Sequence, residues 1–111
     1  MHHPDIEIYH HPNSHIRSYL TGTEISGYLV AFFEKPFTEG VPEDLEKRLG
    51  RIGTQLAKEL MGLGGVAAFH LKPKEIRIRK KTATPWETLE DRILEIVRRA
   101  NRKSRIRLVK G

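Results

Sequence analysis

Apolar and polar residues alternate in several short stretches of the chain, a pattern typical of strands that bury one face. Strands are predicted at residues 6–9, 16–20, 25–33, 66–71 and 75–81. Turn residues separate them: Pro12 and Asn13 follow the first strand, and Pro73 lies between the last two. The stretch at 66–71 is apolar on both faces, so we expect it inside a sheet rather than at an edge.

Apolar residues at spacings of three and four predict a helix in the middle of the chain. Its apolar stripe consists of Leu45, Leu49, Ile52, Leu56 and Leu60. Gly50 and Gly53 interrupt the pattern, and each costs a helix about 1 kcal/mol relative to alanine. Two alternatives stay open: one bent helix over residues 42–62, or a short helix to about Leu49 followed by a second from about Thr54.

The sequence Thr-Pro-Trp-Glu at 84–87 predicts the start of the last helix. Thr84 suits the N-cap, Pro85 suits the first helical position, and Glu87 would complete a capping box. The predicted buried stripe consists of Trp86, Leu89, Ile93, Ile96, Val97 and Ala100. The predicted solvent face carries the acidic residues Glu87, Glu90, Asp91 and Glu95.

The elements follow the order β-β-β-α-β-β-α, and an alternating piece at 105–109 would add a final strand. Antiparallel hairpins of this kind predict the α+β class: an antiparallel sheet of about four to six strands with two main helices packed on one face. The length of 111 residues suits one domain over residues 1–111. The basic tail at 101–111 either contains the extra strand or is flexible.

Composition excludes several classes of protein. Cysteine is absent, which excludes disulfides, a cysteine nucleophile and iron–sulfur clusters held by thiolates. The longest apolar run, at residues 28–33, is too short to span a bilayer. The first residues lack the pattern of a signal peptide, so we expect a cytoplasmic protein with no membrane partner.

Positive charge is concentrated in the second half of the chain. Residues 1–60 hold six Lys/Arg and nine Asp/Glu, giving −3, whereas residues 61–111 hold fourteen and five, giving +9. A basic half favours nucleic acid, a membrane surface or an acidic protein as partner, or it is simply a solvated basic surface.

The sequence Arg-Ile-Arg occurs twice, at 77–79 and at 105–107. On an extended segment both arginines of a copy share one face, and Lys81 shares the face of the first copy. Like charges would oppose each other if the two copies were neighbouring strands. The copies therefore lie apart, the tail is loose, or an anionic partner neutralises them. We predict that an acidic partner binds a basic surface formed by Arg77, Arg79, Lys81, Arg105 and Arg107.

The six histidines do not predict a metal site. His11 and His15 are four residues apart, but Pro12 argues against a helix there, and an extended chain separates them by about 13 Å. His70 is expected at a strand edge or in the core. No serine has the context of a nucleophile elbow. We therefore expect no catalytic residues, no cofactor and no metal ligands.

Several short motifs resemble those of a known family. Gly-Gly-Val at 64–66, the apolar strand that follows it and Glu-Ile-Arg-Ile at 75–78 resemble the N-terminal domain of the NifU-like (Nfu) iron–sulfur scaffold proteins. The helix start Trp-Glu-Thr-Leu at 86–89 and the turn His-Pro-Asn-Ser at 11–14 are similar to elements of that domain. The resemblance covers roughly residues 5–100 and implies an α+β fold.

The chain departs from that family in its chemistry. The family's scaffolds carry the cluster on a Cys-x-x-Cys motif in a separate C-terminal domain, and this chain has no cysteine. The resemblance therefore implies a stand-alone domain without scaffold activity. We expect a non-enzymatic accessory or docking module in iron–sulfur cluster assembly, whose partner is an iron–sulfur assembly protein or another acidic protein. The alternative is a basic nucleic-acid-binding domain.

Overall fold

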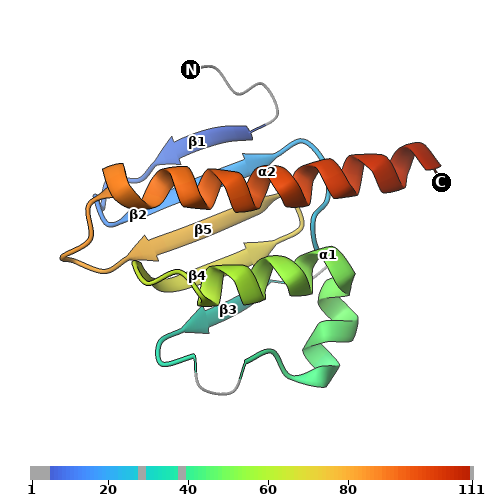
Figure 1. Ribbon diagram of the computed structural model, residues 1–111, viewed down its shortest axis with the longest axis horizontal. Helices are drawn as coiled ribbons and strands as arrows, with labels where there is room; N and C mark the ends of the chain where they lie inside the picture. The colour runs from blue at the N-terminus through green and yellow to red at the C-terminus, as the bar shows by residue number, and fades with distance from the viewer. Residues whose placement is uncertain (1–5, 28–29, 38–39, 111) are drawn as a thin grey trace.

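The computed structural model describes residues 6–27, 30–37 and 40–110, with side chains described up to Ser104. The strands are β1 (Ile6–His10), β2 (Ile16–Thr21), β3 (Ala31–Glu34), β4 (Val66–Lys72) and β5 (Glu75–Lys80), and the helices are α1 (Glu43–Met61) and α2 (Trp86–Lys110). All strand pairs are antiparallel, in the order β1-β2-β5-β4-β3 (Figure 1). The predicted α+β class and element order are confirmed, and β4 lies inside the sheet as expected.

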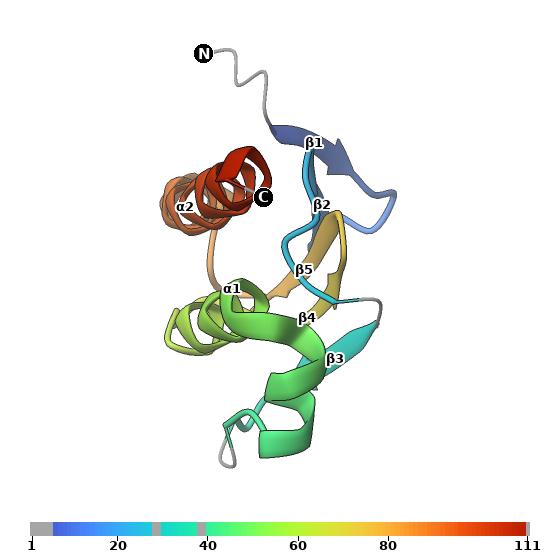
Figure 2. The ribbon, with the colours of Figure 1, turned by 90° about the vertical axis from the view of Figure 1, so that its right-hand side faces the viewer.

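Both helices pack on one face of the sheet, so neither described helix covers the other face (Figure 2). The core lies between these two layers. Its fully buried side chains include Tyr19, Phe69, Leu71, Ile76 and Ile78 from the strands and Leu49, Leu56, Leu60, Ile93 and Val97 from the helices. The predicted stripe of α2 is buried along its whole length, from Trp86 to Ala100.

A kink at Gly50 divides α1 into two helical segments. Gly50 has φ +84° and ψ 176°, a backbone conformation that is essentially restricted to glycine. The structure thus supports the two-helix alternative, but the second segment begins at Arg51 rather than at Thr54. The N–H of Gly27 donates to the carbonyl of Leu49 over 2.9 Å, so the connection between β2 and β3 passes directly against the kink.

The third strand is shorter than predicted. The pattern predicted a strand at 25–33, but β3 covers only Ala31–Glu34. Ile25 is buried and its N–H donates to the carbonyl of Pro73, so this residue contacts the β4–β5 turn instead of a neighbouring strand. Residues 28 and 29 of the predicted strand lie outside the described residues. An apolar pattern alone did not distinguish a buried connection from a strand.

The start of α2 differs from the predicted cap. Among the described residues, no hydrogen bond joins the Thr84 hydroxyl or the Glu87 carboxylate to the first turn, so the capping box is not formed. Instead, the indole N–H of Trp86 donates to the carbonyl of Ser14 over 2.8 Å. This bond ties the helix start to the turn between β1 and β2.

The alternating piece at 105–109 is helical rather than a strand. α2 continues to Lys110, because no glycine or proline interrupts the chain from Trp86 to that point. Five alternating residues were too short a signal to outweigh the continuing helix.

Candidate protein-binding face

The uncovered side of the sheet carries outward-pointing side chains from all five strands. Ile76 and Ile78 are fully buried against the helices, so Arg77 between them points to the other side. The strand pairings assign the facing residues of the other strands. This open face consists of Glu7 and Tyr9 of β1, Ile16, Ser18 and Leu20 of β2, Phe32 and Glu34 of β3, Ala68, His70 and Lys72 of β4, and Glu75, Arg77 and Arg79 of β5.

Large apolar side chains are exposed on the open face. Within the part of the chain that the structure describes, the exposed large hydrophobic residues are Tyr9 at 52%, Phe32 at 52% and Val30 at 59%. Tyr9 lies on one edge strand and Phe32 on the other, and Val30 directly precedes β3. The solvent face of an antiparallel sheet is ordinarily polar, and exposed apolar groups mark interaction sites. The sequence pattern had not identified these residues, because it cannot show which sheet face is left without helices.

Phe32 packs on His70 beside a shallow groove in the open face. The ring centroids are 4.6 Å apart. The groove has a volume of about 140 Å³, and its lining includes Ile16, Phe32, His70 and Arg77. Burial lowers the pKa of His70, and the nearby charges of Arg77 and Lys72 lower it further. The expectation of an edge or core position for His70 is wrong, since the residue lies on an interior strand and faces outward.

The first Arg-Ile-Arg copy lies on the open face, where both arginines have acidic neighbours. Arg79 Nη2 lies 2.8 Å from Glu34 Oε2, and Arg77 Nη2 lies 3.5 Å from Glu75 Oε2. The Nε of Arg77 is buried and has no hydrogen-bond partner among the described residues. Lys81 is exposed one residue beyond the end of β5.

The structure does not bring the five predicted basic residues together. Arg77 and Arg79 lie on the open face, whereas residues 105 and 107 belong to the last turns of α2, which lies on the opposite side of the sheet (Figure 2). The prediction of one shared surface assumed that the second copy was a strand. Binding of a partner by any of these residues stays a prediction.

A polar network crosses the open face at its other end. The Ser18 hydroxyl donates to Glu75 Oε2 and lies 2.8 Å from His11 Nε2, which then donates to the hydroxyl oxygen. Burial raises the pKa of Glu75, but the bond from Ser18 and the charges of Lys72 and Arg77 outweigh this effect, so the pKa lies below its usual value. Ser18 is 1% exposed, and its hydroxyl donates its hydrogen bond to the carboxylate rather than to the histidine. The network therefore joins strands and lacks the geometry of a nucleophilic triad.

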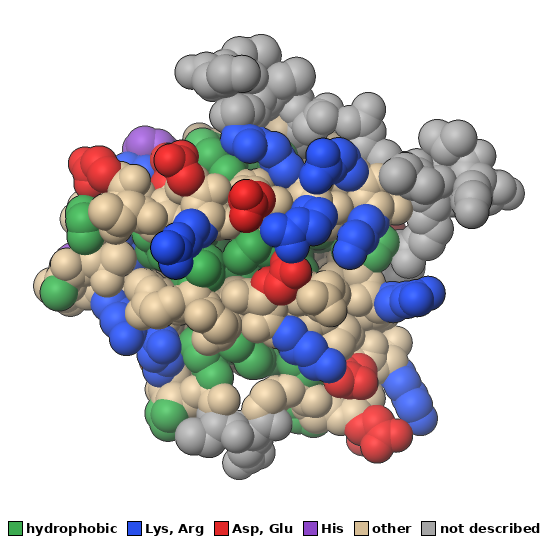
Figure 3. Space-filling view, viewed as in Figure 1, with side chains coloured by type: hydrophobic (Ala, Val, Ile, Leu, Met, Phe, Trp, Pro, Cys, Tyr) green, Lys and Arg blue, Asp and Glu red, His purple; other side chains and the backbone are tan. Residues whose placement is uncertain are grey.

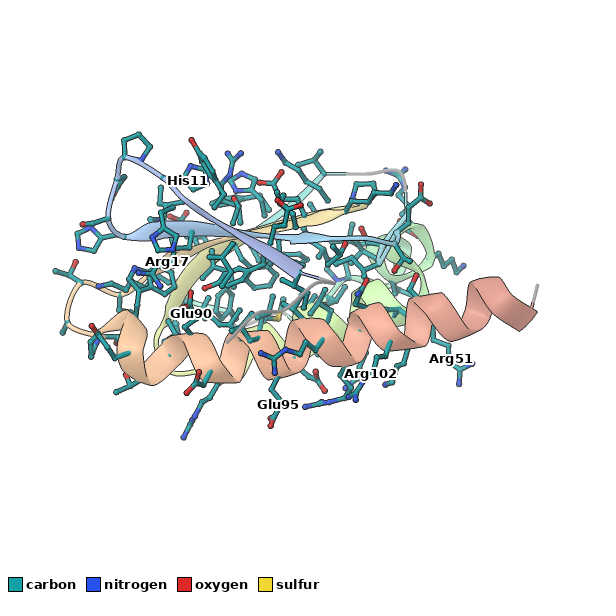
Figure 4. The ribbon with its side chains drawn as sticks, turned by 90° about the horizontal axis from the view of Figure 1, so that it is seen from above. His11, Arg17, Arg51, Glu90, Glu95 and Arg102 are labelled. Atoms are coloured by element: carbon teal, nitrogen blue, oxygen red, sulfur yellow. The ribbon has the colours of Figure 1, made fainter. Side chains whose placement is uncertain are left out.

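A second polar cluster joins β2 to α2. Glu90 Oε1 accepts from Arg17 over 2.8 Å (Figure 4) and from the Tyr19 hydroxyl, also over 2.8 Å. Arg17 also lies over the Trp86 ring. The prediction that Glu90 lies on the solvent face of the helix is therefore wrong. Burial and then the charge of Glu90 raise the pKa of Tyr19. Arg17 and Tyr19 are two residues apart in β2, so they lie on the same face of the strand, toward the helices. A cation on this face could have indicated an acidic partner on α2.

The described residues contain no group of three or more His, Asp or Glu side chains that could hold a metal ion. Over the same residues, neither helix has the length and apolar character needed to cross a membrane.

Comparison with solved structures identifies proteins of similar fold. Protein SAV1430 from Staphylococcus aureus superposes with a TM-score of 0.61 at 15% identity, over 84% of this chain and 98% of that one. A NifU-like protein from Saccharomyces cerevisiae superposes with a TM-score of 0.60 at 16% identity, over 83% of this chain and 73% of that one. The chain shares its fold with a NifU-like protein. No family model matches the sequence, and no curated protein does.

Proposed function

We propose that the chain is a non-enzymatic docking module in iron–sulfur cluster assembly and that its partner binds the open face. The observation that carries this proposal is the exposure of Tyr9 and Phe32 at the two edges of a sheet face that neither described helix covers, with Val30 exposed directly before β3. The fold shared with a NifU-like protein supports the choice of iron–sulfur assembly over other processes.

The charge of the open face favours a protein partner over nucleic acid. Its cations are Lys72, Arg77 and Arg79, and its anions are Glu7, Glu34 and Glu75, so the strand residues of this face sum to zero. Nucleic-acid binding depends on net positive charge, whereas protein interfaces combine aromatic anchors with a mixed polar rim. Tyr9 and Phe32 are the anchors in this proposal.

The arginines give the proposed partner its chemistry. The side chain of Arg77 is 37% exposed on this face, so a carboxylate of the partner can pair with its guanidinium group. Arg79 has an exposed acidic neighbour, Glu34, and exposed ion pairs of this kind contribute little, so Arg79 is available to exchange partners. An iron–sulfur assembly protein with an acidic patch fits these groups.

A second candidate function is nucleic-acid binding, which one other observation favours. Residues 98–110 contain seven Lys/Arg and no Asp/Glu, and they belong to a single helix. A run of cations on a helix can follow a phosphate backbone.

The proposal is tested by affinity capture from native lysate, followed by mass spectrometry. The immobilised wild type is compared with a Tyr9→Ser/Phe32→Ser variant, whose changes lie at exposed positions. A Thr82→Ser/Thr88→Ser variant, altered at exposed positions outside the open face, is the matched control. Circular dichroism melts establish that each variant is folded.

We expect the wild type and the control to retain an iron–sulfur assembly protein that the open-face variant loses. Equal retention by all three proteins would contradict docking on the open face. Failure to retain any assembly protein, together with salt-sensitive binding of duplex DNA or single-stranded RNA, would favour the second candidate.

A further inference from the structure

A groove of about 440 Å³ runs between the two helices, on the side of the molecule opposite the open face. Its apolar lining consists of Ile52, Leu56 and Ala100, and its cationic lining consists of Arg51, Arg99 and Lys103. Figure 3 shows Lys and Arg side chains gathered over the C-terminal half of α2 and the adjoining part of α1. The groove therefore combines an apolar floor with a basic rim.

One end of the groove is closed by a polar network between the helices. Arg99 Nη1 lies 2.8 Å from Glu59 Oε2, and Arg99 Nη2 lies 3.5 Å from Glu95 Oε1. Gln55 donates to the same carboxylate of Glu59 over 3.1 Å. The charge of Arg99 is thus already compensated by two carboxylates of this chain.

The other end carries two cations without such compensation. The helices run in opposite directions, so Arg51, two turns before Glu59, lies toward the same end as Lys103, one turn after Arg99 (Figure 1). Both residues are exposed, and neither forms an ion pair with any described residue. Figure 4 shows Arg51 and Arg102 on the side of the helices that faces away from the sheet. An anionic group between Arg51 and Lys103 would relieve their mutual repulsion.

We propose that this groove binds an acidic amphipathic peptide segment of a partner protein. An apolar side chain of the segment contacts Ile52 above the buried Leu56 and Ala100, and its carboxylates pair with Arg51 and Lys103. The site lies outside the open face, so it adds a second and independent contact to the proposed function.

The lining favours a peptide over nucleic acid. None of the described residues that line the groove is aromatic, so bases would find no stacking platform. The apolar floor suits a leucine or isoleucine side chain.

The test is a fluorescence anisotropy titration with a labelled helical peptide that has leucines at every third or fourth position and glutamates between them. One comparison peptide replaces the leucines with serine, and another replaces the glutamates with glutamine. The protein variants are Arg51→Glu/Lys103→Glu and Ile52→Ser. The matched control, Lys47→Glu/Lys74→Glu, makes the same change in net charge at exposed positions away from the groove. Thermal melts verify folding, and Arg51→Ala and Lys103→Ala replace the double variant if it is unfolded.

We expect the leucine–glutamate peptide to bind the wild type, with about tenfold weaker binding to the Arg51/Lys103 variant and a weaker complex with Ile52→Ser. The affinity of the control variant for the leucine–glutamate peptide should fall by less than about threefold, and both comparison peptides should bind the wild type weakly. Absence of binding would overturn the proposal. Equal losses in both charge variants would do the same, because only net charge would then matter. Tighter binding of single-stranded RNA or duplex DNA with the same dependence on Arg51 and Lys103 would assign the groove to nucleic acid instead.

Discussion

At Gly27 the β2–β3 connection meets the kink of α1 with no room for a side chain. A Cβ at this position would lie 1.9 Å from the carbonyl oxygen of Arg48, far inside van der Waals contact. We predict that Gly27→Ala lowers the free energy of unfolding by about 1–3 kcal/mol, because the helix or the connection must move. Gly22→Ala is the control, since nothing lies within 4 Å of its Cβ. Urea melts that show equal stability for the two variants would contradict this close approach.

His70 links the stability of the fold to pH. Its pKa is lowered by burial and by Arg77 and Lys72, so the folded state favours the neutral ring. The unfolded chain binds the proton more tightly than the folded chain. The contribution of the neutral His70 ring to the free energy of unfolding is therefore complete above the ordinary pKa of 6.5, and it is lost as the pH falls toward the lowered pKa of the folded state. We predict an NMR-detected pKa for His70 below 6.5 that rises in Arg77→Ala. A value above 6.5 in the wild type would contradict the described environment.

At the scale of elements, the sign of the stability change caused by Gly50→Ala reports whether α1 is kinked. In a continuous helix Gly50→Ala would stabilise the protein by about 1 kcal/mol. Because Gly50 has φ +84° and ψ 176°, we predict instead that Gly50→Ala destabilises the fold by about 1–3 kcal/mol. Chemical denaturation measures the sign directly. A stabilised variant would mean that α1 is one helix in solution.

The start of α2 depends on the anchoring of Trp86 rather than on a cap. Trp86 is buried, its N–H bonds to Ser14, and its ring lies 4.7 Å from the Arg17 guanidinium. We predict a loss of about 3–5 kcal/mol for Trp86→Ala, and of about 1 kcal/mol for Trp86→Phe, which keeps most of the packing but loses the bond to Ser14. Thr84→Ala should cost less than about 0.5 kcal/mol, since its hydroxyl does not cap the helix. If urea melts show the largest loss of stability for Thr84→Ala, the helix start is held by the capping box and not by Trp86.

The periodicity of apolar residues was sufficient to predict the helices and strands, but it was insufficient to predict where they begin and end. The stripe from Trp86 to Ala100 and the alternation around Ile76 gave the helices, the hairpin and the buried faces, because burial repeats with the geometry of each element. The limits of β3 and the last turns of α2 depend on contacts with distant segments, such as that of Ile25 with Pro73. Local sequence does not contain those contacts.

The candidate sites depended even more on arrangement in space. Arg77 and Arg79 were correctly placed on one face of a strand, but the sequence could not show that Phe32 and His70 lie on the same side. The inter-helix groove was missed because Arg51 and Lys103 are 52 residues apart and meet only through the packing of α1 against α2.

At the scale of the whole molecule, the two layers separate two kinds of surface. The open face combines exposed aromatic residues with balanced charge, whereas the helix side carries a groove with a basic rim (Figures 2 and 3). A docking module can use both sides at once, since a partner on one face does not cover the other. In this account the open face carries the proposed function.

Site-specific photo-crosslinking tests that central claim most directly. A photoreactive phenylalanine analogue replaces Phe32 on the open face, and in a parallel protein it replaces the exposed Glu87 on α2. After irradiation in native lysate, mass spectrometry identifies the adducts. The account predicts an adduct with an iron–sulfur assembly protein from position 32 and none from position 87. An adduct with that protein from position 87 alone, or none from either position, would contradict docking on the open face.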